Sequence, residues 1–233
     1  MNELVSGLLH LTGAGLLLVG APGLRRRLGD APLLRAGRAV HLAAALLLLV
    51  ASGTYHCAAY ALGAAHPTTG ALRLLDHVAV WLLIGGLFTL PHLLAFRSVW
   101  RWGPLAAVWL GALAGAVHEA HSFGSKSVLA TFALPAGLGL LGVASVARLA
   151  WERGLRATRW VLACYGAFAL GSVFFLWPPP DLVPGLVGAH ELWHVGVLLG
   201  IAAHDRFVHD LASGAREAPR PGPATGSARA AFG

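Results

Sequence analysis

The sequence predicts an all-α integral membrane protein, a bundle of seven transmembrane helices. Of its 233 residues, 57% are hydrophobic and only 12% are charged, whereas about a quarter of the residues of a soluble domain are charged. The apolar residues gather in charge-poor segments close to the roughly 20 residues that a helix needs to cross the hydrocarbon core. Helices also satisfy their own backbone hydrogen bonds in lipid.

Seven segments fit this length. They are Leu4–Gly20, Val40–Leu62, Asp76–Phe96, Gly103–Val117, Ser127–Ala147, Trp160–Trp177 and Leu182–Ala203. The fourth is the shortest, and we expect it to extend through His118 or to cross a thin region of the bilayer. We assign residues 1–213 to the seven-helix domain. Residues 214–233 are rich in Gly, Ala, Pro and Arg, a composition that predicts a disordered tail.

Local signals refine the helices in chain order. Only Glu3 precedes the first apolar run, so the basic start of a cleaved signal peptide is missing. Asp76 is expected to open the third helix. Pro91 and Pro135 predict kinks in the third and fifth helices. The run from Pro178 to Asp181 predicts the end of the sixth helix and an extended link to the seventh.

The net charge of +7 comes from arginines in the loops after helices one, three and five and in the tail, whereas the opposite side has only Arg73 and Lys126. The arginine-rich side is therefore predicted to be cytoplasmic, with the N-terminus outside. Because no aromatic-interleaved basic patch exists, a nucleic-acid partner is not expected. Cys57 and Cys164 lie inside apolar segments, which argues against a disulfide framework.

Polar residues recur near three helix ends. His190 and His194 are four residues apart and would share one helix face, as would Ser52 and His56. Helix alternation places these residues and Asp76 at a similar depth on the outer side. Each has a simpler explanation alone: Asp76 as an N-cap, Ser52 bonded to its own backbone, and each histidine as a satisfied polar residue. Their joint placement favours a metal site, because ionisable groups are costly in a membrane.

The residue types suit zinc. Three neutral imidazoles, from His56, His190 and His194, leave a fourth tetrahedral position open for water, which is typical of catalytic sites. Asp76 could accept the proton of that water, and Ser52 could stabilise the water or a developing oxyanion. Tyr55 is a candidate outer partner of an imidazole. Such a site near a lipid interface would suit hydrolysis of an amide or ester in a lipid.

The other histidines are mostly expected to be structural. His118 and His121 form a pair three residues apart on the same predicted side, so an accessory ligand or a polar entrance remains open. The residues expected to be structural are His66, His92, His204 and His209.

The motifs SGTYH, LDHVAVWLLIGGLFTL and HELWHVGVLLGIAAH resemble the hemolysin III family, within the wider group of progestin and adipoQ receptors and alkaline ceramidases. The resemblance runs from His10 to His204. It implies seven helices and a zinc ion held by three histidines, here His56, His190 and His194, with Ser52 and Asp76 beside the water. The run Gly85–Thr89 departs from the more polar sequence of many relatives. We expect a bacterial inner (plasma) membrane location and membrane lipids as partners.

Three function classes remain open. The first is a zinc-dependent hydrolase of lipid-like amides, similar to the ceramidases. The second is a non-enzymatic sensor, receptor-like protein or pore with a structural zinc. The third is a haem protein, because His41 and His56, and His190 and His204, are each spaced by about four helical turns. Ser52 and Asp76 would have no use in a haem protein.

Overall fold

A computed structural model describes residues 2–125 and 127–217. Eight α-helices and one short 3-10 helix make up nearly all of this part of the chain, which contains no strand and one isolated bridge between Val183 and Val187. The helices are α1 Glu3–Leu28, α2 Pro32–Leu62, α3 Pro67–Ala95, α4 Ser98–Ser122, α5 Val128–Leu140, α6 Gly142–Arg153, η1 Leu155–Thr158, α7 Arg159–Leu176 and α8 Ala189–Glu217. The predicted all-α class is confirmed.

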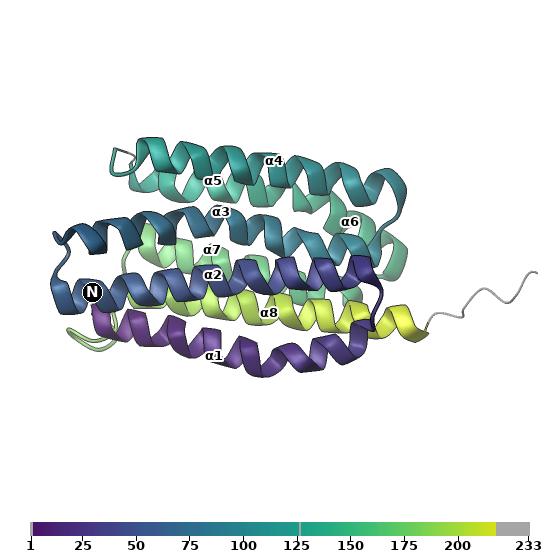
Figure 1. Cartoon of the computed structure of the whole chain (residues 1–233), viewed down its shortest axis with the longest axis horizontal. Coiled ribbons are helices and arrows are strands. Elements are labelled where there is room, and N and C mark those ends of the chain that lie inside the picture. Colours follow the sequence, from purple (N-terminus) through teal and green to yellow (C-terminus); the bar gives the residue numbers. More distant parts are fainter. Residues whose placement is uncertain (1, 126, 218–233) are drawn as a thin grey trace, which may run out of the picture.

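The helices lie along one long axis and alternate in direction (Figure 1). Helices α5 and α6 follow each other as one crossing with a break at Leu141, so the described chain makes seven passes. Glycines at 137, 139 and 142 surround the break and weaken helix propensity there. The predicted proline sites, Pro91 and Pro135, lie inside α3 and α5.

Five of the passes are long and apolar enough to cross a membrane. They are Glu3–Leu28, Pro32–Leu62, Pro67–Ala95, Leu129–Arg153 and Leu155–Leu176. Helices α4 and α8 lie in the same bundle, and α4 extends past both ends of its predicted apolar segment. The chain is therefore built as an all-α membrane bundle.

Sequential helices are neighbours: α2 packs between α1 and α3, and α4 packs on α3. Helix α8 packs on α7, α1 and α3 and thus closes the bundle. A buried apolar layer joins α2 to α8 through Leu48, Leu49, Val197 and Ile201. These residues lie one to two turns from the predicted metal ligands His56, His190 and His194. The apolar layer therefore lies directly beside the predicted metal site.

The predicted starts of α3 and α8, the two that bear on the site, were wrong. Helix α3 begins at Pro67, with His66 as its N-cap, so Asp76 lies more than two turns inside the helix and caps nothing. Helix α8 begins at Ala189, because residues 182–188 form a loop with a backbone bond from Val187 N–H to the Val183 carbonyl. In both cases apolar composition did not mark the residue at which the hydrogen-bonded helix begins.

The end of α8 also differs from the prediction. The helix continues to Glu217, past the predicted start of the tail at Gly214, as the helix-forming residues Ala215, Arg216 and Glu217 allow. Residues 218–233 lie outside the described part of the chain.

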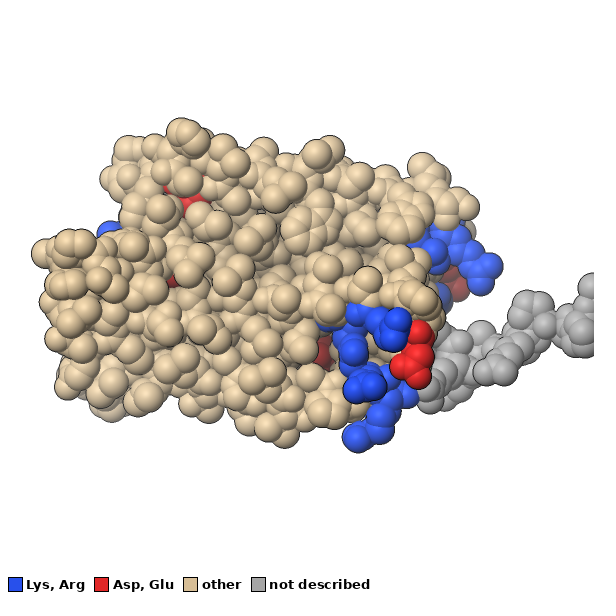
Figure 2. Space-filling model, viewed as in Figure 1, with Lys and Arg blue, Asp and Glu red and all other residues tan. Residues whose placement is uncertain are grey.

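Basic residues gather at one end of the bundle. Figure 2 shows Lys and Arg at the end where the α1–α2 connection and the last turns of α8 lie, while most of the opposite end is free of them on this face. The start of α1 and the start of α8 lie at that opposite end (Figure 1). The basic residues are thus distributed unevenly between the two ends of the helix bundle.

Candidate metal centre

Three histidine side chains from two helices meet at one point. His56 projects from α2, and His190 and His194 project from the first two turns of α8. The Nε2 atoms of His190 and His194 are 2.8 Å apart, and they lie 3.5 Å and 3.0 Å, respectively, from Nε2 of His56. His56 and His194 are buried, and His190 is half-buried. These three residues could hold a metal ion, as the four-residue spacing predicted.

The donor set fits a tetrahedral transition metal. Metal–nitrogen bonds of 2.0–2.1 Å place neighbouring ligand nitrogens about 3.3 Å apart in a tetrahedron. The three Nε2 separations bracket this value. A tetrahedral ion held by three histidines has one further position, which water fills in catalytic zinc sites. The geometry therefore suits an ion with an open coordination site.

Glu3 fixes the orientation of His56. The Nδ1 of His56 lies 2.5 Å from Oε2 of Glu3, the first residue of α1. An Nδ1–H that donates to the carboxylate leaves the Nε2 lone pair free for a metal, and such carboxylate partners also raise the ligand's basicity. Tyr55, the partner expected from the sequence, instead packs its ring beside His56 with centroids 4.5 Å apart.

Close packing of α1 on α2 brings Glu3 within reach. A side chain at Gly7 would meet Sγ of Cys57 at 2.7 Å and the carbonyl oxygen of Gly53 at 3.1 Å. At Gly53 a Cβ would meet Cγ of Leu11 at 2.7 Å. Glycine is thus required on both surfaces of this contact.

Glu191 ties the start of α1 to the start of α8. Its Oε1 accepts hydrogen bonds from the backbone N–H of Asn2 at 2.6 Å and the Ser6 hydroxyl at 3.3 Å. Its Oε2 accepts from the N–H of Gly188 at 3.0 Å. Because Glu191 lies between the two histidines of α8, the same connection positions the metal ligands and Glu3 relative to each other.

Ser52 lies one turn from His56 on α2, beside Asp76 of α3. The Ser52 side chain is buried, and its hydroxyl makes no hydrogen bond of normal geometry within the described residues. The Asp76 carboxylate lies close enough to interact with this hydroxyl, and it also interacts with Arg73. Neither simpler explanation therefore holds: Ser52 does not bond its own backbone, and Asp76 is not an N-cap.

Several other histidines have structural roles. His92 is buried with Nδ1 2.9 Å from the Phe88 carbonyl oxygen and Nε2 3.0 Å from the Ser145 hydroxyl. His66 caps α3 by accepting from the N–H of Thr68. Both agree with the sequence-based expectation.

The His118–His121 pair takes no part in the three-histidine group. Both side chains are exposed, and the buried member of this motif is Glu119, which lies 3.3 Å from Nδ1 of His77 and 3.3 Å from Nε1 of Trp81. The motif thus buries its carboxylate between α3 and α4.

The second histidine pair of the haem hypothesis lies nearer the arginine-rich end. A haem held between α2 and α8 would use one histidine of each helix, so the two axial pairs would be His56 with His190 and His41 with His204. The rings of His41 and His204 are stacked with centroids 5.3 Å apart, and Asp205 lies 4.0 Å from His41 and 3.6 Å from His209. In both proposed pairs the imidazoles contact each other, so a macrocycle between them would require α2 and α8 to separate. This packing argues against haem.

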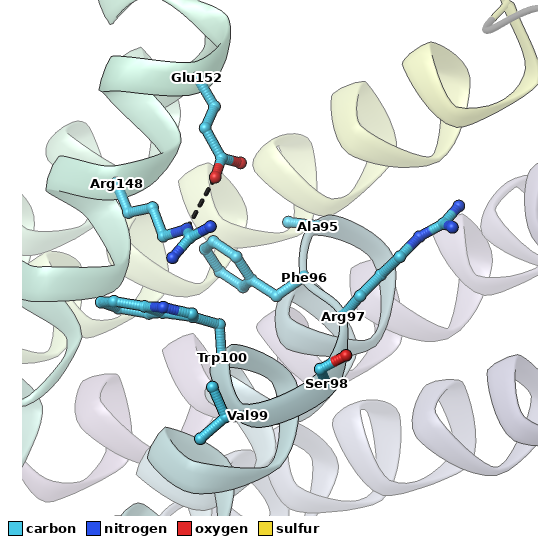
Figure 3. A pocket seen from close by; sticks show the side chains of 8 residues that line it. All are labelled: Ala95, Phe96, Arg97, Ser98, Val99, Trp100, Arg148 and Glu152. Atoms are coloured by element: carbon cyan, nitrogen blue, oxygen red, sulfur yellow. Dashed lines mark hydrogen bonds and ion pairs between the residues drawn. The ribbon is translucent and has the colours of Figure 1, made fainter.

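A surface cavity of about 460 Å³ lies where α3 turns into α4 and faces α6. Figure 3 shows the Arg148 side chain between Glu152, its ion-pair partner, and the ring of Trp100, whereas Arg97 points away. The cavity lies beyond the C-terminal end of α3, at the opposite end of that helix from Asp76. It is therefore separate from the three histidines.

Comparisons with known proteins agree with the resemblance. A family model described as Haemolysin-III related matches residues 1–205. The chain is also similar to a protein of Bacillus cereus named Hemolysin-3, with 29% identity over 138 residues. That match covers 59% of this chain and 60% of the relative, so the chain spans less than two thirds of the relative's length.

Proposed function

The chain belongs to the haemolysin-III related family, and we propose that it is a zinc-dependent hydrolase of lipid-like amides. The observation that carries the proposal is the convergence of three Nε2 atoms within 3.5 Å of one another. The buried Ser52 hydroxyl lies one turn from His56, with Asp76 beside it. His56, His190 and His194 are the proposed ligands.

A zinc ion held by His56, His190 and His194 would supply a Lewis acid and would lower the pKa of a water molecule bound to it. Asp76 is proposed to accept the proton that this water releases. Ser52 is proposed to donate its hydroxyl hydrogen to the oxygen that becomes negative when the amide carbonyl is attacked. Asp76 of α3 would thus transfer the proton, and Ser52 of α2 would stabilise the negative charge.

The surroundings of His190 favour a lipid substrate. His190 is half-buried, and its ring centroid lies 5.5 Å from that of Phe175. Phe132 contacts both Phe175 and Trp193, with centroids 5.0 Å and 4.9 Å apart. Aromatic side chains from α5, α7 and α8 therefore form an apolar surface next to the proposed ligand, and an acyl chain could lie along it.

The test begins with the metal content of detergent-purified protein, wild type beside His194→Ala. We expect about one zinc per chain, lost in the variant, and release of fatty acid from a ceramide-type amide by the zinc-loaded wild type. A folded, metal-replete wild type without zinc would overturn the proposal. Zinc without turnover of lipid amides or esters would overturn the hydrolase while leaving the metal centre.

A non-enzymatic role is the alternative. The relative is named a hemolysin, which favours a pore, a sensor or a receptor-like protein. One observation supports a structural zinc: α2 packs mainly on α1 and α3, and α8 on α7, α1 and α3. A metal between His56 and the α8 histidines would therefore add a direct link between α2 and α8 to the apolar layer that the two helices share. Unfolding on zinc removal, with no turnover, would favour this alternative.

A further inference from the structure

A fourth histidine lies against the candidate metal centre. His10 of α1 is 2% exposed, and its ring meets that of His194 edge to face, with centroids 4.3 Å apart. Neither ring nitrogen of His10 has a hydrogen-bond partner within the described residues. Buried polar atoms without partners are rare in folded proteins and call for an explanation.

His194 also has a buried ring nitrogen without a hydrogen-bond partner among the described residues. Its Nε2 points to the other two candidate ligands, and its Nδ1 is buried without a partner in the described part of the chain. A metal-binding imidazole carries its proton on the nitrogen that faces away from the metal, and that N–H almost always donates to an acceptor. For His56 the acceptor is Glu3. For His194 the neighbouring polar side chain is His10.

We propose that His10 is the positioning residue of His194: one of its ring nitrogens accepts the Nδ1–H of His194, directly after a small ring rotation or through one water. The inference rests on the proposed function, because it requires His194 to bind a metal through Nε2. Glu3 and His10 are two turns apart on the same face of α1. Helix α1 would then orient two of the proposed ligands, His56 of α2 through Glu3 and His194 of α8 through His10.

If His10 only fills space in the core, its ring nitrogens should not matter for metal binding. Substitutions at His10 therefore distinguish a packing role from the positioning role. His10→Leu fills a similar volume with an apolar side chain and removes both ring nitrogens. His10→Asn and His10→Gln keep a hydrogen-bond acceptor near the positions of Nδ1 and Nε2, respectively. His92→Leu is the matched control, because His92 is a buried histidine whose two nitrogens bond to Phe88 and Ser145 instead.

The measurement is the zinc affinity of each detergent-purified chain by chelator competition, with the absorption spectrum of the cobalt-substituted protein as a second readout. We expect His10→Leu to lose about 10- to 100-fold in affinity and to alter the cobalt spectrum. At least one of His10→Asn and His10→Gln should stay within a few-fold of wild type, and His92→Leu should keep wild-type affinity.

Unchanged affinity in His10→Leu, or equal losses in all three His10 variants, would overturn the positioning role and leave the proposed function intact. A wild-type protein that binds no metal would overturn both. The wild-type titration, made before any variant, therefore distinguishes the two failures.

Discussion

Oε2 of Glu3 lies 2.5 Å from Nδ1 of His56, although 53 residues separate the two in the sequence. The contact joins the first residue of α1 to the last quarter of α2, and it exists because α1 folds back along α2 with glycine at the interface. A carboxylate in this position selects the tautomer of His56 that offers Nε2 to a metal. The start of α1 is therefore part of the candidate metal centre.

The first prediction concerns Glu3. Glu3→Ala removes the acceptor of His56 Nδ1, and we expect zinc affinity to fall about 10- to 100-fold. Chelator competition on detergent-purified protein measures the effect. Glu152→Ala is the control, because Glu152 pairs with Arg148 beside the cavity near the α3–α4 turn, away from the histidines. Wild-type affinity in Glu3→Ala would show that the contact does not support metal binding.

The second prediction separates binding from chemistry. Because Ser52 and Asp76 are not among the candidate ligands, Ser52→Ala and Asp76→Asn should retain about one zinc per chain. Asp76→Asn should lower lipid-amide turnover about 10²- to 10⁴-fold, the usual contribution of a general base. His190→Ala and His194→Ala should lose the metal itself. Equal metal loss in all four variants would contradict the separate roles.

The third prediction concerns Glu191, which is 1% exposed and accepts three hydrogen bonds. Glu191→Ala leaves the N–H groups of Asn2 and Gly188 without their acceptor, at a cost on the order of 1–3 kcal/mol for the buried Gly188 N–H and less for the partly buried Asn2 N–H. Metal-free protein should therefore unfold at a lower temperature. Glu191→Gln, which keeps one acceptor oxygen, should lose less. Equal unfolding temperatures for wild type and both variants would rule out this stabilising role.

The fourth prediction uses two glycines of one helix. Gly7 faces Cys57 and Gly53 at close range, whereas a Cβ at Gly15 would meet nothing within 4 Å. Gly7→Leu should push α1 away from α2, cost about 1–3 kcal/mol from overpacking and weaken zinc binding through the lost Glu3–His56 contact. Gly15→Leu should leave zinc affinity unchanged and should not lower stability, because leucine favours the helix more than glycine does. Chelator competition and thermal unfolding of both variants check this difference.

Sequence reasoning predicted the all-α fold and the meeting of His56 with His190 and His194, because hydropathy, helical spacing and helix alternation are local or additive signals. Helix starts were predicted poorly, since α3 and α8 are defined by hydrogen bonds and caps rather than by apolar length. Glu3, His10 and Glu191 were missed as site residues, because their roles depend on how α1 packs against α2 and α8. The spacing of Glu3 and His10 by two helical turns was the available signal.

The last prediction concerns the orientation of the bundle. The positive-inside tendency places the arginine-rich end in the cytoplasm and the three histidines near the outer surface. In a chain with Cys57 and Cys164 replaced by Ala, we expect Asp30→Cys, in the α1–α2 connection, to react with a membrane-impermeant thiol reagent only in inside-out vesicles. Ser125→Cys, in the exposed α4–α5 connection at the other end, should react only from the outside. The reverse pattern would place the histidines on the cytoplasmic side, where a lipid substrate would have to come from the inner leaflet.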